Sequence, residues 1–460
     1  MIPLPLARIA EVTSGALAGM ADPRAIAGGP VVIDSREAGP GSLFVAIKGE
    51  RSDGHDFATA AVETGAVAVL ASRPVDAPAV IVPDTTRALA ELAAAVHAEL
   101  TSATTVGITG SAGKTSTKDL LAGLTARVGP TVAPVNSFNN EIGHPLTVLK
   151  ADASTRFLVL ELSARDIGHI AHLARVAPPR IGVVLNVGTA HLGVFGGRDA
   201  IAKAKGELVE TLPAHGIAVL NADDPHVRAM AGRTDARVTL FGRSADAAVR
   251  AEDVTVEDGR ASFTLRTPSG AAEVRLRLYG EHAVDNALAA AAAGYELGIP
   301  VAVIADELSR AEPRSHWRME VTERADGVTV VNDAYNANPD SMRAAFQAHT
   351  ALAGGRRRLA VVAALRELGD ESDRLNEELG RLAGGAGLSA LVVVGPGAGP
   401  VLAGAHAAGG ATEIVHVDDA AGAIAEIGGR LASGDVLLIK GPRAMRLERV
   451  AAGLLGGAST

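Results

Sequence analysis

The 460-residue sequence contains no cysteine and few aromatic residues, and it has no long hydrophobic run. The lack of cysteine excludes disulfides, thiol catalysis and cysteine-based metal sites. Aromatic residues are 3% of a chain that is 48% hydrophobic, so its cores must rely mainly on Ala, Val and Leu. Apolar runs are too short to span a membrane, and Met1–Pro5 lacks the charged start and apolar core of a signal peptide. We therefore expect a cytoplasmic protein that does not insert into a membrane.

The chain also has fewer basic than acidic residues. The 52 acidic residues outnumber the 43 Lys and Arg residues, which gives a formal net charge of −9. This balance disfavours nucleic acid as the main partner. The length exceeds what one typical core can organise, so about two to four domains are expected.

Three α/β segments follow one another along the chain. Residues 1–102 hold short strands and helices. Residues 103–312 alternate continuous apolar strands with helices, which is typical of a parallel sheet covered on both faces, and turn signals between residues 238 and 279 predict an antiparallel extension. Residues 313–460 show a second alternation, which predicts a doubly wound, Rossmann-like unit. The predicted fold class is therefore α/β, with three domains.

The most informative stretch is Gly107–Ser116, which joins an apolar strand to a helix. Its glycines let the backbone point several N–H groups at one anion, and the helix N-terminus adds partial positive charge. Lys114 can reach the outer phosphates of a nucleotide, and the hydroxyl of Thr115 can ligate Mg²⁺. The usual spacing would place the first glycine at Ile108, whereas this chain has Gly110. A ligand-free turn is the alternative, but the combination favours a triphosphate site of an unusual subclass.

Polar residues follow the next strands of the same segment. Glu161 ends one apolar strand, and Asn186 and His191 follow another. Such positions meet nucleotide-bound Mg²⁺ at the carboxyl edge of an α/β sheet, although each residue alone could be an ordinary surface group. Lys203 and Lys205 stand where a helix is expected to begin, and their ordinary interpretation is a charged, solvated helix face.

Two further polar loops stand out. Residues 332–341 pack Asp, Tyr and several Asn side chains just past a strand, and Arg318 precedes them. Part of this polarity is turn and cap chemistry, but its density indicates a binding loop. Asp34–Arg36 and the 48–56 region could bind a substrate, or form a turn with a salt bridge.

Taken together, these residues resemble the Mur ligase family. The family's phosphate loop, T-G-x-x-G-K-T, matches Thr109–Thr115, and its strand-end Glu matches Glu161. Further matches are Asn186 with His191 (N-x-x-x-x-H), Lys205 in Ala-Lys-Gly-Glu, Asn286 in the later helix, Asp333–Pro339 (D-x-Y-N-A-N-P), Asn136–Thr147 (N-x-x-N-N-x-I-G-x-P-L-T), and Asp34–Arg36 with Gly54–Phe57 (the UDP-sugar domain).

The resemblance implies an ATP site with two Mg²⁺ ions and a carbamylated lysine at Lys205. The implied catalytic residues are Lys114, Lys205 and His191. The implied metal ligands are Thr115, Glu161, His191 and Lys205. The implied nucleotide-binding residues are Gly110, Ser111, Ala112, Gly113, Lys114, Thr115, Ser116, Asn286, Arg318, Asp333, Tyr335, Asn336 and Asn338. The implied substrate-binding residues are Asp34, Ser35, Arg36, Asn136, Asn139 and Asn140.

The resemblance also implies a reaction. The branch with this D-x-Y-N-A-N-P signature uses ATP to convert a peptide carboxylate into an acyl phosphate, which the amine of a dipeptide attacks. The implied substrates are UDP-N-acetylmuramoyl-tripeptide and D-alanyl-D-alanine, and the implied process is peptidoglycan precursor synthesis. The first domain would hold the UDP-sugar, the second ATP, and the third the far side of the nucleotide and the incoming amine. We expect a monomer.

Four departures from the family pattern lie in the third segment. Ala364 replaces an acid, Asn376 stands where a His is common, Pro442 interrupts K-G-S-R, and Trp317 precedes the Arg-Met-Glu motif. They leave open a related amide ligase with another amine substrate, such as an antibiotic-pathway homologue. A non-catalytic nucleotide- or muropeptide-binding sensor is the alternative from another class.

Overall fold

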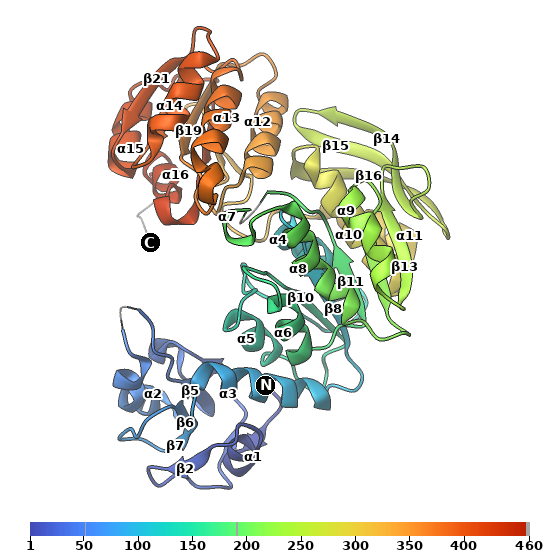
Figure 1. Cartoon of the computed structure of the whole chain (residues 1–460), viewed down its shortest axis with the longest axis vertical. Coiled ribbons are helices and arrows are strands. Elements are labelled where there is room, and N and C mark those ends of the chain that lie inside the picture. Colours follow the sequence, from blue (N-terminus) through green and yellow to red (C-terminus); the bar gives the residue numbers. More distant parts are fainter. Residues whose placement is uncertain (51, 190–191, 457–460) are drawn as a thin grey trace.

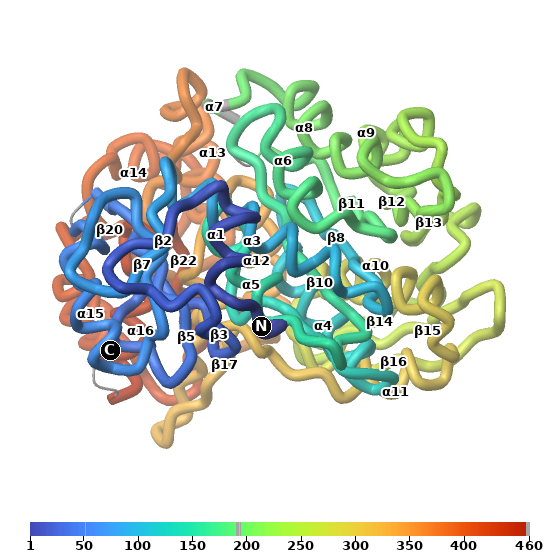
Figure 2. Tube along the Cα trace, turned by 90° about the horizontal axis from the view of Figure 1, so that it is seen from below, coloured from blue at the N-terminus to red at the C-terminus, as the bar shows by residue number. Residues whose placement is uncertain are grey.

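The structure is a computed structural model that describes residues 1–50, 52–189 and 192–456. Three α/β units are arranged along its long axis, with the N-terminal unit at the bottom of Figure 1 and the C-terminal unit at the upper left. In the view from below, the N-terminal unit is nearest the reader and the hairpins β14–β16 extend to one side (Figure 2). The predicted α/β class with three units is confirmed. Among the described residues, none of the helices combines the length and the apolar character needed to cross a membrane.

The N-terminal unit is built on a five-stranded sheet. Its strands β4 to β7 are parallel, and β2 adds antiparallel to β7. In sheet order the strands are β2 (Ala16–Ala18), β7 (Ala79–Ile81), β6 (Ala66–Ala71), β5 (Ser42–Val45) and β4 (Val31–Val32), and β1 (Leu4–Pro5) pairs separately with β3 (Ile26–Ala27). The helices are α1 (Leu6–Val12), α2 (Ala58–Thr64) and α3 (Thr85–Glu99), with 3₁₀ turns η1 (Ser35–Glu37) and η2 (Gly54–Phe57).

The middle unit contains a nine-stranded sheet. Its parallel part consists of β9 (Thr131–Val132), β10 (Phe157–Glu161), β8 (Thr104–Thr109), β11 (Ile181–Val184), β12 (Ile217–Asn221) and β13 (Arg237–Gly242), in that spatial order. The predicted extension is present as β14 (Val249–Glu257), β15 (Arg260–Thr267) and β16 (Gly270–Tyr279), which form antiparallel hairpins. The helices are α4 (Lys114–Ala126), α5 (Gly143–Val148), α6 (His169–Val176), α7 (Leu192–Phe195), α8 (Arg198–Glu210), α9 (Pro225–Ala229), α10 (His282–Glu296) and α11 (Val301–Arg310), with η3 (Met230–Arg233).

Helices cover both faces of the parallel part, as continuous apolar strands require. Helices α4 and α10 bury one face, and α6 and α8 bury the other. Six alanines of α10, at 287 and 289–293, are fully buried. Small side chains let this helix approach the sheet and α4 closely, so a tight core forms with few aromatic residues.

The C-terminal unit has a six-stranded sheet. Its order is β17 (Glu320–Glu323), β18 (Thr329–Asn332), β22 (Val436–Lys440), β19 (Arg358–Ala363), β20 (Ala390–Val394) and β21 (Glu413–Val417). All neighbours are parallel except β17, which pairs antiparallel with β18. The helices are α12 (Pro339–Ala353), α13 (Ser372–Gly384), α14 (Ala398–Ala407), α15 (Ala420–Gly428) and α16 (Glu448–Leu454), with η4 (Gly369–Glu371) and η5 (Arg443–Met445). The edge strands β17 and β21 were not predicted, because their half-exposed sequences lack a continuous apolar run.

Candidate active site

A cleft with a volume of about 960 Å³ lies between the carboxyl edges of the middle and C-terminal sheets. The middle unit contributes the loops that follow β8, β9, β10 and β11, and the C-terminal unit contributes the loops that follow β18, β19 and β22. The sequence-predicted residues that line it are Ser111, Ala112, Gly113, Lys114, Thr115, Ser116, Asn139, Asn140, Glu161, Asn286, Arg318, Asp333, Tyr335, Asn336 and Asn338. The structure therefore gathers most of the predicted nucleotide site on facing walls of one cleft.

The phosphate loop is shaped by two asparagines from other elements. Gly113 precedes α4 with φ of +82°, and a Cβ there would lie 2.2 Å from Asn286 Oδ1, so only glycine fits. The Oδ1 atom of Asn186 accepts hydrogen bonds of 2.9 Å from the backbone N–H groups of Ser111 and Ala112. The loop is thus held from outside, and the N-terminus of α4 faces the cleft.

Lys114 is folded back over its own loop. Its Nζ donates to the carbonyl of Gly110 over 2.8 Å. Burial lowers the pKa of Lys114, the nearby Glu161 carboxylate opposes this shift, and the Arg318 guanidinium adds to it. Gly110 itself is buried beneath the loop and does not line the cleft. The Lys114 amine is therefore placed where a phosphate oxygen can replace the Gly110 carbonyl as its hydrogen-bond partner.

Beside the lysine, a hydroxyl and a carboxylate form a pair suited to a hard cation. Thr115 Oγ1 donates to Glu161 Oε2 over 2.9 Å, and Asn139 Nδ2 donates to Glu161 Oε1 over 2.7 Å. Glu161 is only 1% exposed. Buried oxygen ligands of this kind fit Mg²⁺. Within the described ranges no three His, Asp or Glu side chains gather to hold a metal, so phosphate or other oxygen ligands would complete the shell.

Lys205 corrects one prediction. Helix α8 begins at Arg198, so Lys203 and Lys205 lie inside it rather than at its start, and Lys205 is buried rather than solvated. Burial lowers the pKa of Lys205 well below its usual value, and the charge of Lys114 adds to the shift. Lys205 does not line the cleft. The prediction for His191 falls outside the described residues.

The C-terminal wall carries its own ion pair. Lys440 Nζ lies 2.6 Å from Asp333 Oδ2 and donates to the carbonyl of Asn336 over 3.0 Å. The Arg318 guanidinium stacks 4.1 Å from the centre of the Tyr335 ring, and its Nε is buried without a hydrogen-bond partner. An unpartnered guanidinium donor at the rim of the cleft fits an anion such as a nucleotide phosphate.

Part of the polar 332–341 loop has the structural role that the alternative interpretation allowed. Asn338 caps α12, because its Oδ1 accepts from Ser341 N over 2.8 Å in a capping box. Asp340, in the first turn of α12, reaches the middle unit, where its Oδ2 accepts from Thr189 N and Thr189 Oγ1 over 2.8 and 2.9 Å. The loop therefore both builds a helix start and bridges the two units.

Only some of the predicted substrate-binding residues line the cleft. Asn139 and Asn140 line the cleft, whereas Asn136, which has a left-handed φ of +64°, does not. Asp34–Arg36 lies in the N-terminal unit, outside the cleft lining. There the Arg36 side chain and backbone N–H lower the pKa of Asp34 to about 2, so these residues form the turn with a salt bridge that the sequence allowed.

Sequence reasoning missed several cleft residues, which include Ser137, His282, Arg366, Lys440 and Arg443. Ser137 and Lys440 lie inside motifs that were recognised, so a closer look at the unmatched motif positions could have found them. Burial lowers the pKa of His282, with Asp333 opposing the shift and Lys440 adding to it. His282 and Arg366 stand inside the sequence segments that carry Asn286 and Ala364, but only the tertiary fold brings their side chains to the cleft.

Comparisons with known proteins agree with this geometry. Three family models match the chain: the Mur ligase family catalytic domain over residues 30–100, the Mur ligase middle domain over 108–294, and the Mur ligase glutamate ligase domain over 317–443. The UDP-N-acetylmuramoyl-tripeptide–D-alanyl-D-alanine ligase of Mycobacterium tuberculosis is 47% identical over an alignment of 500 residues, which covers 99% of this chain and 98% of the relative.

Two crystal structures match along nearly the whole chain. That of MurF from Acinetobacter baumannii has a TM-score of 0.88 at 30% identity and covers 99% of both chains. That of the MurF ligase from Thermotoga maritima in complex with ADP has a TM-score of 0.80 at 32% identity, and covers 93% of this chain and 97% of that chain.

Proposed function

The chain belongs to the Mur ligase family, and we propose that it joins D-alanyl-D-alanine to UDP-N-acetylmuramoyl-tripeptide at the expense of ATP, in peptidoglycan precursor synthesis. The observation that carries this proposal is the cleft itself. It places Lys114 with the Thr115–Glu161 pair on one wall and the Asp333–Lys440 pair on the other. The relatives that match over the full length of the chain carry this activity in their names.

In this reaction the tripeptide carboxylate would be activated as an acyl phosphate, and the dipeptide amine would displace the phosphate. Lys114 and the N-terminus of α4 would neutralise the charge on the transferred phosphoryl group. Arg318 would add a second cation from the C-terminal wall. Because both walls face one cleft, binding there would align the carboxylate and the amine, and such positioning accounts for much of the rate enhancement in phosphoryl and acyl transfer.

We assign one Mg²⁺ to Thr115 and Glu161 and a second to His191 and a carbamate on Lys205. Bound metal would supply charge neutralisation at the phosphates. The Thr115–Glu161 pair fits this role by its chemistry and burial. The carbamate is supported by the lowered pKa of Lys205, because only the neutral amine reacts with carbon dioxide. A carbamate would turn this buried amine into an anionic oxygen ligand.

The remaining assignments extend the same proposal. Residues 1–102 would bind the UDP-sugar, with Asp34, Ser35 and Arg36 as contacts; residues 103–312 would bind ATP; and residues 313–460 would bind the far side of the nucleotide and the amine. Asn136, Asn139 and Asn140 would contact the muramoyl tripeptide. We further propose a cytoplasmic monomer.

A different amine substrate is the second candidate, and the departures at Trp317, Ala364, Asn376 and Pro442 favour it, because Pro442 lines the cleft. ATP-dependent phosphate release separates the candidates. We expect release with UDP-N-acetylmuramoyl-tripeptide and D-alanyl-D-alanine together, and little with either alone. Release that needs another amine would replace the dipeptide assignment. Nucleotide binding without release under any combination would contradict a ligase and indicate a sensor.

A further inference from the structure

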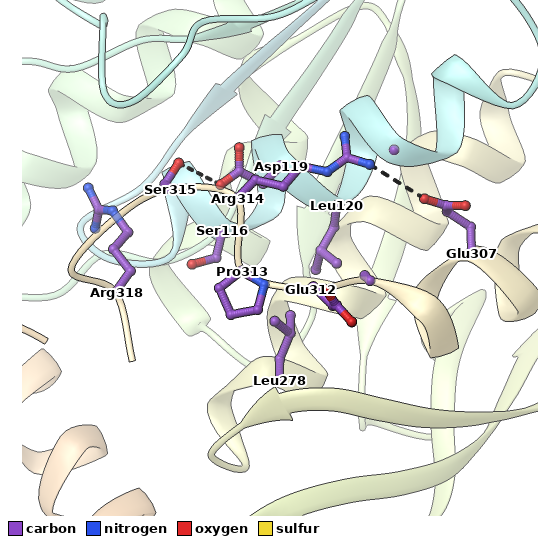
Figure 3. A pocket seen from close by; sticks show the side chains of 12 residues that line it. Ser116, Asp119, Leu120, Leu278, Glu307, Glu312, Pro313, Arg314, Ser315 and Arg318 are labelled. Carbon is purple, nitrogen blue, oxygen red and sulfur yellow. Dashed lines mark hydrogen bonds and ion pairs between the residues drawn. The ribbon is translucent and has the colours of Figure 1, made fainter. Parts of the chain in front are cut away.

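The segment Ser315–Arg318, which leads from α11 into β17, is fastened to the middle unit at both ends. Ser315 Oγ donates to Asp119 Oδ2 over 2.6 Å, and the two side chains point toward one another (Figure 3). Arg318 Nη2 donates to Ser137 Oγ over 2.7 Å. This segment is the covalent connection between the middle and C-terminal units, whose facing sheet edges form the cleft. Its contacts with the middle unit therefore affect the position of one cleft wall relative to the other.

The Asp119 carboxylate, which accepts the hydrogen bond from Ser315, is also held by the buried Lys118. Lys118 is 1% exposed, and its Nζ lies 2.5 Å from Asp119 Oδ1 and 2.8 Å from the carbonyl oxygen of Pro134. Pro134 lies in the loop that carries Ser137. Lys118 therefore connects the two fastening points through the interior of the middle unit. A charged pair buried in this way is much more strongly directional than an exposed one.

The second fastening point reaches the proposed metal ligands. Thr115 Oγ1 has one proton, which it donates to Glu161 Oε2, so Ser137 must donate to Thr115 Oγ1 over their 2.8 Å contact. Ser137 then accepts from Arg318. A directed chain of hydrogen bonds thus runs from Arg318 through Ser137 and Thr115 to Glu161.

Other contacts of the connecting segment are weaker. The Arg314–Glu307 ion pair is 3.8 Å long and Arg314 is exposed, a kind of pair that contributes little. A cavity of about 40 Å³ lies beside the segment, lined by Leu120, Leu278 and Pro313 (Figure 3). It has room for little more than water, so the segment is not packed tightly there, and the hydrogen bonds to Asp119 and Ser137 are its short polar contacts with the middle unit.

We propose that Asp119 and Ser315 are positioning residues, which set where Arg318 enters the active-site cleft and so fix the C-terminal wall against the phosphate loop. They touch neither substrate nor nucleotide and act through Arg318. Losing a hydrogen bond to a carboxylate that is mostly buried typically costs a factor of about ten or more in the equilibrium it supports. We expect Ser315→Ala to lower the population of the aligned arrangement by about that factor.

The experiment combines an activity-independent readout with kinetics, because the kinetic arm rests on the proposed ligase function. The chain has no cysteine, so Asp235→Cys in the middle unit and Ala411→Cys in the C-terminal unit give a clean pair of spin-label sites on exposed positions. Distance distributions are measured with ADP and Mg²⁺ for the labelled protein with and without Ser315→Ala. Ser154→Ala is the matched control, because Ser154 Oγ also donates to an aspartate, Asp152, over 2.6 Å, but on the exposed surface.

We expect Ser315→Ala to broaden or shift the distance distribution, to lower kcat/KM for the amine about tenfold, and to leave the ADP dissociation constant within twofold. Asp119→Asn combined with Ser315→Ala should cost no more than the larger single change, because both break one contact. Ser154→Ala should match the wild type. A distance distribution unchanged by Ser315→Ala in a folded protein would overturn the proposal, whatever the activity. A broadened distribution in a protein without ligase activity would keep the positioning role and overturn the proposed function.

Discussion

Removing the side chain of Asn186 tests whether the phosphate loop is preorganised from outside. Its Oδ1 accepts from the N–H groups of Ser111 and Ala112, and its Nδ2 donates to the carbonyl of Ala112 over 3.2 Å. In Asn186→Ala the Ser111 N–H retains a 3.1 Å bond to the backbone carbonyl of residue 186, whereas the Ala112 N–H loses the partner described here. The main effect of the substitution is therefore that the Ala112 N–H, in the centre of the loop, loses its hydrogen-bond partner.

Leaving one such donor without its partner costs about 1–3 kcal/mol where water cannot replace the bond fully. In the nucleotide-free variant the loop can change its conformation to give the Ala112 N–H another partner. Nucleotide binding must then restore the original conformation, and the free energy of doing so weakens the binding. We expect ADP with Mg²⁺ to bind Asn186→Ala about 5- to 150-fold more weakly than the wild type, measured by titration calorimetry. The thermal unfolding temperature shows whether the variant is folded.

Asn221 provides a matched control on the neighbouring strand. Asn221 also stands at a strand end, its Nδ2 donates to the carbonyl of Leu185 over 2.8 Å, and its Oδ1 accepts from Asp223 N over 2.9 Å. It does not line the cleft. Asn221→Ala should therefore lower stability without changing ADP affinity by more than twofold. The reasoning is refuted if a folded Asn186→Ala binds ADP as tightly as the wild type, or if Asn221→Ala weakens binding equally.

Three further predictions follow from buried basic groups. Lys114→Ala should lower phosphate release by more than about 100-fold while the protein stays folded, and wild-type turnover would contradict its assigned role. Lys205→Ala should be inactive and partly rescued by acetate, a carboxylate that can replace the proposed carbamate; activity without acetate would contradict the carbamate. Burial lowers the pKa of His349 to about 4 from 6.5, so between these values the unfolded state binds a proton that the folded state does not, and stability falls as pH drops. Urea unfolding at pH 7 and pH 5 should show a loss about 2 kcal/mol larger in the wild type than in His349→Gln, and equal losses would contradict this account.

The parts of the fold that a local pattern specifies could be predicted from sequence. Continuous apolar strands such as Phe157–Glu161 and Ala390–Val394 can be recognised in the sequence, because strands buried on both faces carry few polar interruptions. The edge strand Glu413–Val417 was missed because none of its residues is buried, so it carries no continuous apolar run. Lys205 was misplaced because Arg198 opens that helix after Gly197, so no capping side chain marks the start of the helix in the sequence.

In the candidate site, too, local motifs predicted some features and only the folded structure shows the others. Glycine at position 113 was expected from the motif, but the fold supplies the reasons for it, which are the left-handed φ of +82° and the Asn286 side chain that reaches it from a distant helix. Nothing in the sequence sets Lys118 and Asp119 apart from other charged residues of a helix, yet the fold buries Lys118 and places Ser315 against Asp119. Motifs identify side chains with chemical roles, whereas the contacts that orient those side chains are long-range and become visible only in the folded chain.

Two departures from the family pattern, Asn376 and Trp317, each contact a residue that is next in the sequence to another departure. Asn376 Oδ1 accepts from the backbone N–H of Leu365 over 2.7 Å, and its Nδ2 donates to the Leu365 carbonyl over 3.2 Å, so it holds the residue next to Ala364 from within the core. The guanidinium of Arg443, which follows Pro442, stacks 4.4 Å from the Trp317 ring. These contacts keep the C-terminal unit ordered around the departures, and Pro442 itself lines the cleft on the wall proposed to receive the amine. The amine specificity of the phosphate-release assay is therefore the property in which the departures should appear.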